Sequence, residues 1–397
     1  MNIIWINDFI VKDKFTKNYP FMEIIEYIDK RELEIIIITL KLIIKGAKKK
    51  QVPNYFIFEK EYYNDSNKNR FSRLQKFIIS LIKGSPIYLV KKLIQLKQEK
   101  TVVHLFSGFI TSFFGALTCK LLNLPCIIGP NAIPSKNLIF KNISKLSNIK
   151  FFIRDLIISR LPCNKFLCFS NYHQYILNKK FRISDKKMEI IGIGINPGRF
   201  HILKLNNSTY KLFNNMSKTI LYVGLPIEEK GFYKFIRICK LLIDRGIIVN
   251  IIIIGIKNKK LRLKLKREFK QLTKNIYIFG WISRLNLIYY YNLADLYINP
   301  SIDESWSMTT IEALSCGTPC ICPNIPIFRY HIKEYKNGLL FKINNLEDMF
   351  LKIVEGLKMN WNRDEISKNA QIKYNWEKQA VKLLEVYKKI RTGDNYS

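Results

Sequence analysis

Short apolar runs rich in Ile and Val recur along the whole chain, and longer stretches with helical periodicity lie between them. This alternation is typical of βαβ units, in which parallel strands are buried on both faces and are joined by helices. The fold class is therefore predicted to be α/β with doubly wound parallel sheets. In the first half we predict strands at about 2–7, 34–40, 54–58, 101–106, 125–129, 166–169 and 189–193.

The chain has 397 residues, more than a single hydrophobic core usually serves, so two domains are expected. A polar, Asn-rich stretch at 201–218 interrupts the alternation and is the best candidate for a linker. The second half then restarts with TILYVG, continues with IIVNIIIIG, NIYIFG and DLYINPS, and closes with TPCICP. Two similar domains in tandem predict a cleft between them.

The formal charge is +35, which favours polyanions, anionic lipid surfaces or phosphorylated substrates as partners. A genome-wide codon bias toward Ile, Lys and Asn explains the same excess without any function. Eight cysteines, most of them inside apolar runs, fit a reduced cytosol and lack the paired spacing of a zinc site. With neither a signal-peptide pattern nor a membrane-spanning run, we expect a cytoplasmic protein, peripheral if it meets the inner face of the cell membrane.

Three successive strands of the second half end in glycine, at Gly224, Gly255 and Gly280. Ligands collect outside the carboxyl edge of an open parallel sheet, where these residues are expected. A strand-end glycine can also be only a turn residue. Three in succession indicate that backbone comes close to a ligand along one edge.

The segment 299–321 carries the most informative pattern, in which a strand is followed by a short helix ending at Gly317. Two acids, Glu304 and Glu312, bracket the start of this helix. The unpaired N–H groups at such a start bind a phosphate or a sugar oxygen, and each acid can accept hydrogen bonds from a diol. The residues expected to supply these N–H groups are Ser305, Ser307, Met308 and Thr309, with Ser307 or Thr309 as the helix cap.

This segment resembles the E-x7-E signature of retaining glycosyltransferase family 4, with Glu304 and Glu312 at the acidic positions. Further stretches match in order: IIGIGINPGRF, YVGLPIEEKGF, ADLYINPS and the tail YNWEKQAVKLLEVYKKI. The resemblance implies a GT-B fold of two facing Rossmann-like domains with a cleft between them. It gives an acceptor-side domain at 1–205, a nucleotide-sugar domain at 206–373, and a last helix at 374–392 that packs back on the first domain.

The implied activity is transfer of a hexose, with retention of configuration, from a nucleotide-diphosphate sugar to a saccharide or lipid-linked acceptor. Lys230 is expected at the donor diphosphate and backbone around Gly280 and Trp281 at the base, while Glu304, Lys230 and Asn131 form the catalytic set. The chain contains no Asp-x-Asp pair, so no metal cofactor is required.

Three departures from the family pattern bear on activity. Leu225 stands where the family usually has an arginine, and Lys257 is the candidate replacement. Asn131 stands where the family has a histidine facing the transferred sugar. An amide can form a hydrogen bond to a hydroxyl, but unlike an imidazole it does not take up and release a proton. The family's Gly-Gly loop after the first strand is absent. His104 is interpreted as a strand-end histidine satisfied by hydrogen bonds.

A basic protein that binds nucleic acid or another polyanion is the alternative from a different class. Its lysines would be massed on one face, whereas here they are spread over both halves, so no specific nucleic acid is expected. Within enzymes, a GT-B phosphorylase or synthase is the alternative. An anionic membrane surface is a further expected partner, because 73–100 and 141–160 mix apolar and basic residues at near-helical spacing.

Overall fold

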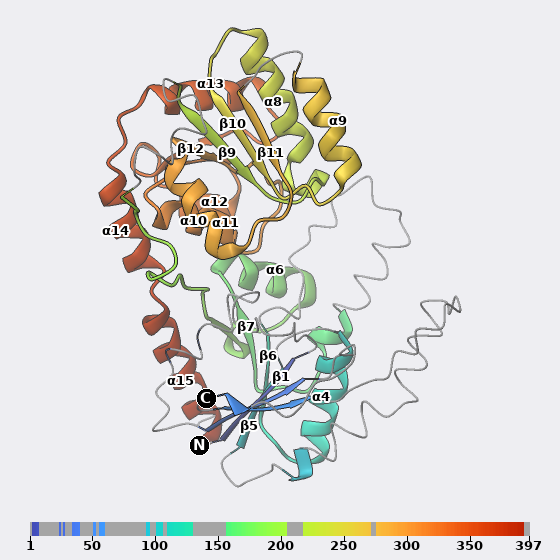
Figure 1. Ribbon diagram of the computed structural model, residues 1–397. Helices are drawn as coiled ribbons and strands as arrows, with labels where there is room; N and C mark the ends of the chain where they lie inside the picture. Colours follow the sequence, from blue (N-terminus) through green and yellow to red (C-terminus); the bar gives the residue numbers. More distant parts are fainter. Residues whose placement is uncertain are drawn as a thin grey trace, which may run out of the picture. The chain divides into compact units, whose positions relative to one another are not determined.

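The structure is a computed structural model in which the chain divides into two compact units (Figure 1). One unit comprises Met1–Gly192 with Glu377–Ser397, and the other comprises Ile193–Trp376. Residues 193–205, expected in the first domain, belong to the second unit. Within that unit, the Ile195 N–H donates to the Tyr374 carbonyl at 2.8 Å. The described residues are 2–7, 24, 27, 34–39, 51–52, 55–59, 93–95, 101–105, 109–129, 156–204, 217–270 and 275–392.

The first unit is built on an eight-stranded sheet in the order β3-β4-β2-β1-β5-β6-β7-β8, parallel except at β3. Every strand predicted in the first half is present near its expected position, and the two-residue β3 was too short to leave a sequence pattern. The strands are β1 (Asn2–Asn7), β2 (Glu34–Thr39), β3 (Gln51–Val52), β4 (Tyr55–Glu59), β5 (Thr101–Leu105), β6 (Cys126–Ile128), β7 (Lys165–Cys168) and β8 (Met188–Ile190).

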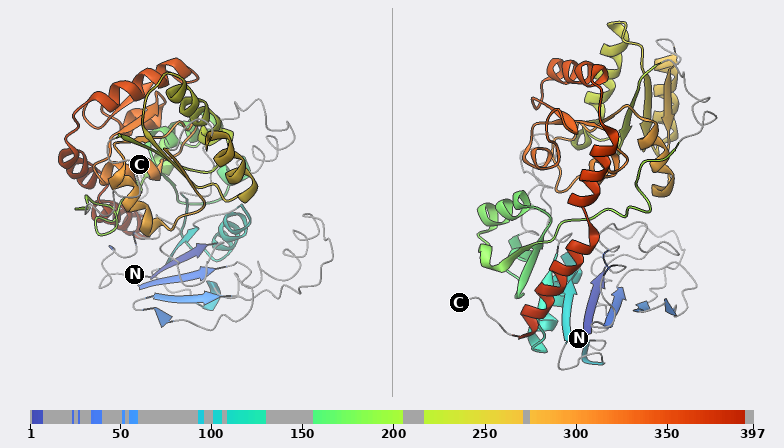
Figure 2. Two further views of the ribbon diagram at one scale, coloured as in Figure 1. Left: turned by 45° about the horizontal axis from the view of Figure 1, so that its top comes forward. Right: turned by 90° about the vertical axis from the view of Figure 1, so that its left-hand side faces the viewer.

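Helices α4 (Phe109–Leu121) and α6 (Asn171–Phe181) pack on this sheet, and η2 (Asp185–Lys187) precedes β8. Their apolar side chains meet those of β5, β6 and β7 in one buried cluster. The last helix, α15 (Trp376–Thr392), returns to this unit after Trp376 and lies beside its strands (Figure 2, right). Its Tyr387 is hydrogen-bonded to His104 of β5 at 2.7 Å.

The second unit contains a fully parallel six-stranded sheet in the order β11-β10-β9-β12-β13-β14. This is the strand order of a Rossmann fold, with the reversal between β9 and β12. The sheet does not close at TPCICP as the sequence suggested, because the four residues GLLF form one more strand. The strands are β9 (Thr219–Val223), β10 (Asn250–Ile254), β11 (Ile276–Phe279), β12 (Leu296–Ile298), β13 (Cys320–Pro323) and β14 (Gly338–Phe341).

Alternate residues of these strands point to opposite faces, and each face is covered by helices. One face packs on α8 (Phe232–Asp244), α9 (Lys259–Lys270) and α13 (Leu346–Lys358) around the main core of the unit. The helices packed together over the other are α10 (Arg284–Leu293), α11 (Met308–Ser315) and α14 (Arg363–Lys373). The short η3 (Glu228–Lys230) and α12 (Pro326–His331) lie in the connections after β9 and β13.

The helices within the described ranges are all too short or too polar to cross a membrane. The structure thus consists of two α/β units with parallel sheets, each with its own core.

Candidate functional site

The candidate site lies where the order of the second sheet reverses. Strands β9 and β12 are neighbours, but the helices that follow them cover opposite faces, so their connecting loops diverge at the carboxyl edge. Such a switch point is where open α/β sheets bind ligands. The loop after β9 carries Lys230, and the loop after β12 carries Glu304.

The loop after β9 is held in shape by its own backbone and by Tyr222. The Tyr222 hydroxyl donates to the Leu225 carbonyl at 2.9 Å, which turns the chain into η3. Gly231 follows Lys230 with φ +64°, and a Cβ there would stand 2.1 Å from the Pro300 carbonyl oxygen. Only glycine fits this close approach, so Gly231 is what allows the Lys230 loop to lie against the loop after β12.

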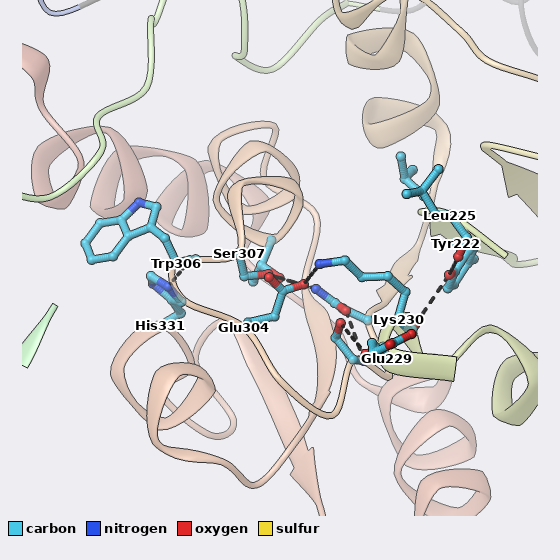
Figure 3. A network of polar contacts seen from close by, with 12 residues as sticks. Tyr222, Leu225, Glu229, Lys230, Glu304, Trp306, Ser307 and His331 are labelled. Atoms are coloured by element: carbon cyan, nitrogen blue, oxygen red, sulfur yellow. Dashed lines mark hydrogen bonds and ion pairs between the residues drawn. The ribbon is translucent and has the colours of Figure 1, made fainter. Parts of the chain in front are cut away.

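The two loops are joined at the Glu229 carbonyl and again at the side chains beside it (Figure 3). The Glu229 carbonyl accepts from the Ile302 N–H and from the Ser301 hydroxyl, both at 3.1 Å. The Lys230 Nζ then lies 2.6 Å from Glu304 Oε1. Their side chains are 36% and 11% exposed, so this ion pair is partly open to solvent. An ammonium has three N–H donors, which leaves two for a ligand oxygen.

The loop from β12 to α11 is fixed by the buried amide of Asn299. Its Nδ2 donates to the Ser307 hydroxyl at 2.9 Å and to the Thr310 hydroxyl at 3.0 Å. Ser307 occupies the N-cap position, as one alternative from the sequence proposed, but its side chain makes no capping hydrogen bond. Its hydroxyl is taken by Asn299 and Thr310, and its backbone is left-handed with φ 60°.

The start of α11 presents a row of backbone donors. In the described part of the chain the N–H groups of residues 305–309 have no hydrogen-bond acceptor, whereas the Thr310 N–H already bonds to the Ser307 carbonyl. Oriented N–H groups at a helix start, with the positive end of the helix dipole, favour an anion. Ser305, Met308 and Thr309 are half-buried here, beside Glu304.

Glu312 lies one turn into α11 and is buried. Its Oε1 accepts from the Arg284 Nε at 2.7 Å and its Oε2 from the Tyr291 hydroxyl at 3.1 Å. The Glu312 side chain is 4% exposed and that of Arg284 16%, so this is a buried charge pair. The guanidinium of Arg284 also lies 5.2 Å from the ring centre of Phe200. Each carboxylate oxygen retains a second lone pair for a ligand hydroxyl.

The three strand-end glycines follow β9, β10 and β11 directly, and each is close to another part of the protein. A Cβ on Gly224 would lie 2.8 Å from the Tyr222 hydroxyl, and one on Gly280 would lie 2.8 Å from Arg262 Nη1. Gly255 has φ +116°, and a Cβ on it would lie 2.2 Å from the Gly224 carbonyl oxygen. Packing within the protein thus requires glycine at 255, where the clash is with backbone, whereas the Arg262 side chain opposite Gly280 can move aside.

The remaining predicted residues are less enclosed. Trp281 is 60% exposed and Leu225 48% exposed, and Lys257 is exposed beyond Gly255. Asn131 lies outside the described residues. His104 is fully buried with both ring nitrogens hydrogen-bonded, and burial lowers its pKa to about 3, as suits a satisfied structural histidine. The described ranges hold no group of three or more His, Cys, Asp and Glu side chains that could bind a metal ion.

The sequence patterns did not identify the residues that hold Glu312 and the Glu304 loop in place by hydrogen bonds. Arg284 and Tyr291 on α10 hold Glu312, while His331 on α12 bonds to the carbonyl of Trp306 in the Glu304 loop (Figure 3). These contacts join residues 21 to 28 positions apart, as their sequence separations show, and a local pattern carries no sign of them.

Comparisons with known proteins show which family and fold the chain resembles. Residues 206–373 match the family model of glycosyl transferases group 1. The chain is 22% identical over 338 residues to the UDP-Gal:alpha-D-GlcNAc-diphosphoundecaprenol alpha-1,3-galactosyltransferase of Escherichia coli, covering 82% of this chain and 85% of that protein.

Two solved structures show the same fold along nearly the whole length. Sucrose-phosphate synthase from Thermosynechococcus elongatus superposes with a TM-score of 0.74 at 14% identity, over 99% of each chain. Anabaena HepE in complex with UDP and glucose superposes with a TM-score of 0.65 at 12% identity, over 96% of this chain and 99% of that one. Residues 206–373 therefore form a glycosyl transferases group 1 domain, and the chain is a GT-B glycosyltransferase that transfers a sugar from a nucleotide sugar.

Proposed function

We propose that this enzyme transfers a hexose from a UDP-sugar to a lipid-linked saccharide, with retention of configuration. The donor diphosphate binds between the Lys230 ammonium and the start of α11. The observation that carries the proposal is the meeting of Lys230 and Glu304 at the switch point of the second sheet, 2.6 Å apart. It gives a cation for the phosphates beside an acid for the sugar hydroxyls.

The chemistry follows from where charge develops. An acceptor hydroxyl oxygen forms a bond to the anomeric carbon on the face that the diphosphate leaves, and the bond from that carbon to the diphosphate oxygen breaks. The departing phosphate oxygen takes the proton of the hydroxyl, so no protein nucleophile is needed. In this proposal, Lys230 and the N–H groups of residues 305–309 stabilise the negative charge that grows on the diphosphate.

The two acids take different roles in this proposal. Glu304 is partly exposed and has one protein partner in the described chain, so it is free to accept from hydroxyls of the transferred sugar. Glu312 is held by Arg284 and Tyr291 and accepts from the ribose diol through its remaining lone pairs. The family resemblance alone suggests Asn131 as a hydrogen-bond donor to the sugar.

The donor and acceptor classes are supported by the relatives. The E. coli relative uses UDP-galactose and a diphosphoundecaprenol-linked sugar, as its name states, and HepE was solved with UDP and glucose. The net charge of +35 suits an anionic lipid carrier at a membrane surface. These features favour a polyprenyl-diphosphate-linked saccharide over a free sugar.

A thermal-shift screen against UDP, GDP, ADP and their hexose derivatives tests the donor. A ligand that binds only the folded state stabilises it by about 2.7 kcal/mol at one hundred times its dissociation constant. We expect a rise in Tm with UDP and a UDP-hexose. A response to none of the nucleotides overturns the proposed donor site, and a response to GDP or ADP alone overturns the choice of base.

The acceptor and the stereochemistry are tested on the product. The enzyme is incubated with the identified nucleotide sugar and a synthetic polyprenyl-diphosphate-linked hexosamine, with the matching free saccharide as the control. NMR of the product gives the anomeric configuration. Transfer to the free saccharide alone overturns the lipid-linked acceptor, and inversion at the anomeric carbon overturns the mechanism.

A further inference from the structure

The Glu304 loop has a second anchor, at Trp306. The backbone carbonyl of Trp306 lies 2.6 Å from His331 Nε2, and His331 Nδ1 lies 2.6 Å from the Tyr374 hydroxyl. The three side chains are buried, with exposures of 5%, 1% and 2% for Trp306, His331 and Tyr374. The indole of Trp306 stands edge-on to the His331 ring at 5.3 Å between centres.

The partners fix the protonation of this chain of contacts. A carbonyl oxygen only accepts, so His331 Nε2 carries the hydrogen and donates it to Trp306. Nδ1 is then the acceptor, and the Tyr374 hydroxyl is its donor. Burial lowers the pKa of His331 to about 3 and raises that of Tyr374 well above its usual value, so both groups keep these states at neutral pH.

The same contacts reach the two places where the chain passes between units. The chain enters the second unit at Ile193 and leaves it after Trp376. The Trp306 indole N–H donates to the Ile193 carbonyl at 3.0 Å, and the Ile195 N–H donates to the Tyr374 carbonyl at 2.8 Å. Gly194 packs on Trp376 so closely that a Cβ would stand 2.5 Å from the indole.

We propose that His331 is a positioning residue of the donor site, and that Tyr374, His331 and Trp306 form a relay that fixes the Glu304 loop against the crossing segments 193–195 and 374–376. The proposal rests on the donor site described under the proposed function. Trp306 lies two residues after Glu304 and one before Ser307, so a shift of its carbonyl moves both Glu304 and the N–H groups at the start of α11.

The first unit supplies a matched control for the relay. There, His104 Nδ1 is 2.7 Å from the Tyr387 hydroxyl and His104 Nε2 is 3.1 Å from the Gly129 carbonyl. The chemistry is the same, the tyrosine is again buried, and burial again lowers the pKa of the histidine to about 3. This pair belongs to a different unit from the nucleotide loops, so it reports the cost of losing such a hydrogen bond without the effect on the donor.

The experiment compares Tyr374→Phe with Tyr387→Phe in the full-length chain. Calorimetry gives the Kd of UDP, and thermal melts give stability. Both variants are expected to melt at lower temperature. Only Tyr374→Phe is expected to raise the Kd of UDP, by about fivefold, which is the effect of one hydrogen bond. Unchanged affinity in Tyr374→Phe, or an equal loss in Tyr387→Phe, overturns the relay.

Substitution of the histidine separates positioning from folding. His331→Gln keeps one amide donor for the Trp306 carbonyl and one acceptor for Tyr374, whereas His331→Leu has neither. UDP affinity is expected to be weakened in the leucine variant and largely restored in the glutamine variant. Equal weakening in both overturns the positioning role.

Lys230→Ala is measured in parallel. If Lys230→Ala keeps full affinity for UDP, the donor site is overturned and the relay with it. If Lys230→Ala loses affinity for UDP while Tyr374→Phe keeps it, only the relay is overturned.

Discussion

The ammonium of Lys230 lies 2.6 Å from the Glu304 carboxylate, although 74 positions separate the two residues in the sequence. The contact depends on Gly231, which lets the η3 turn approach Pro300, and on the Glu229 carbonyl, which accepts from both Ser301 and Ile302. One junction of two loops thus brings a cation and an acid to the reversal point of the sheet.

Glu304→Gln is expected to lower turnover at least tenfold while leaving the fold intact. The variant loses a charged acceptor for the sugar hydroxyls, and a hydrogen bond to a charged group contributes roughly 1.5–3 kcal/mol. Steady-state kinetics with the native donor measures it. Glu355→Gln is the control, because Glu355 forms a comparable pair with Lys352 at 2.8 Å on α13. Wild-type rates in Glu304→Gln would show that the acid has no part in the reaction.

Lys230→Ala is expected to weaken binding of the nucleoside diphosphate by at least tenfold and binding of the nucleoside much less, since only the diphosphate presents negative charge. Calorimetry with UDP and uridine gives the two values, and Lys352→Ala serves as the control. Equal losses for both ligands would move the diphosphate elsewhere, with the exposed Lys257 as the next candidate.

The general fold could be predicted from the sequence because it rests on local patterns, and a local pattern also underlies the proposed site. Buried parallel strands are continuous runs of apolar residues, and the E-x7-E spacing lies within one loop and one helix. Strand β14, four residues that begin at the glycine of an Asn-Gly pair, was not predicted. The compact units divide at Ile193, ahead of the predicted linker, and the contact of Ile195 with Tyr374 joins residues far apart in the sequence.

The residues that hold the site in place could not be predicted either, because their contacts join distant parts of the sequence. Nothing near Glu312 indicates that Arg284 and Tyr291 fill its hydrogen bonds, and nothing near His331 indicates that it reaches Trp306. Those contacts arise only once α10, α11 and α12 have packed. Ser307, one of the two residues predicted as the cap, does occupy the N-cap position, but the Asn299 amide bonds to its hydroxyl.

Glu312→Gln is expected to lower stability as well as activity. It leaves the mostly buried Arg284 guanidinium opposite a neutral amide, and breaking a buried charge pair costs about 3 kcal/mol. Urea unfolding of Glu312→Gln, of Arg284→Met and of the double variant gives the interaction free energy between the two side chains. Purely additive losses would contradict the pairing, and an unchanged unfolding midpoint in Glu312→Gln would contradict the predicted cost.

Membrane attachment is expected to be electrostatic. Segments 73–100 and 141–160, which lie largely outside the described residues, combine Ile, Leu and Phe with Lys and Arg. Each basic residue near an anionic surface contributes about 1 kcal/mol, and salt screens this attraction. Flotation with phosphatidylglycerol vesicles at low salt, with phosphatidylcholine vesicles as the control, measures it. Binding to neither kind of vesicle would favour a soluble acceptor.

Two of the buried histidines, His104 and His331, are expected to make stability fall in mild acid. Burial lowers the pKa of His104 and His331 to about 3 from an ordinary 6.5, so between these values the unfolded chain binds protons that the folded chain does not. Their contribution is complete above pH 6.5 and is lost as the pH falls toward 3. At one pH unit below 6.5 each ring costs about 1 kcal/mol. Urea unfolding at pH 7.5 and 5.5 measures the loss, which should be smaller by that amount in His331→Gln. An equal loss in wild type and variant would show that His331 titrates normally in the folded protein.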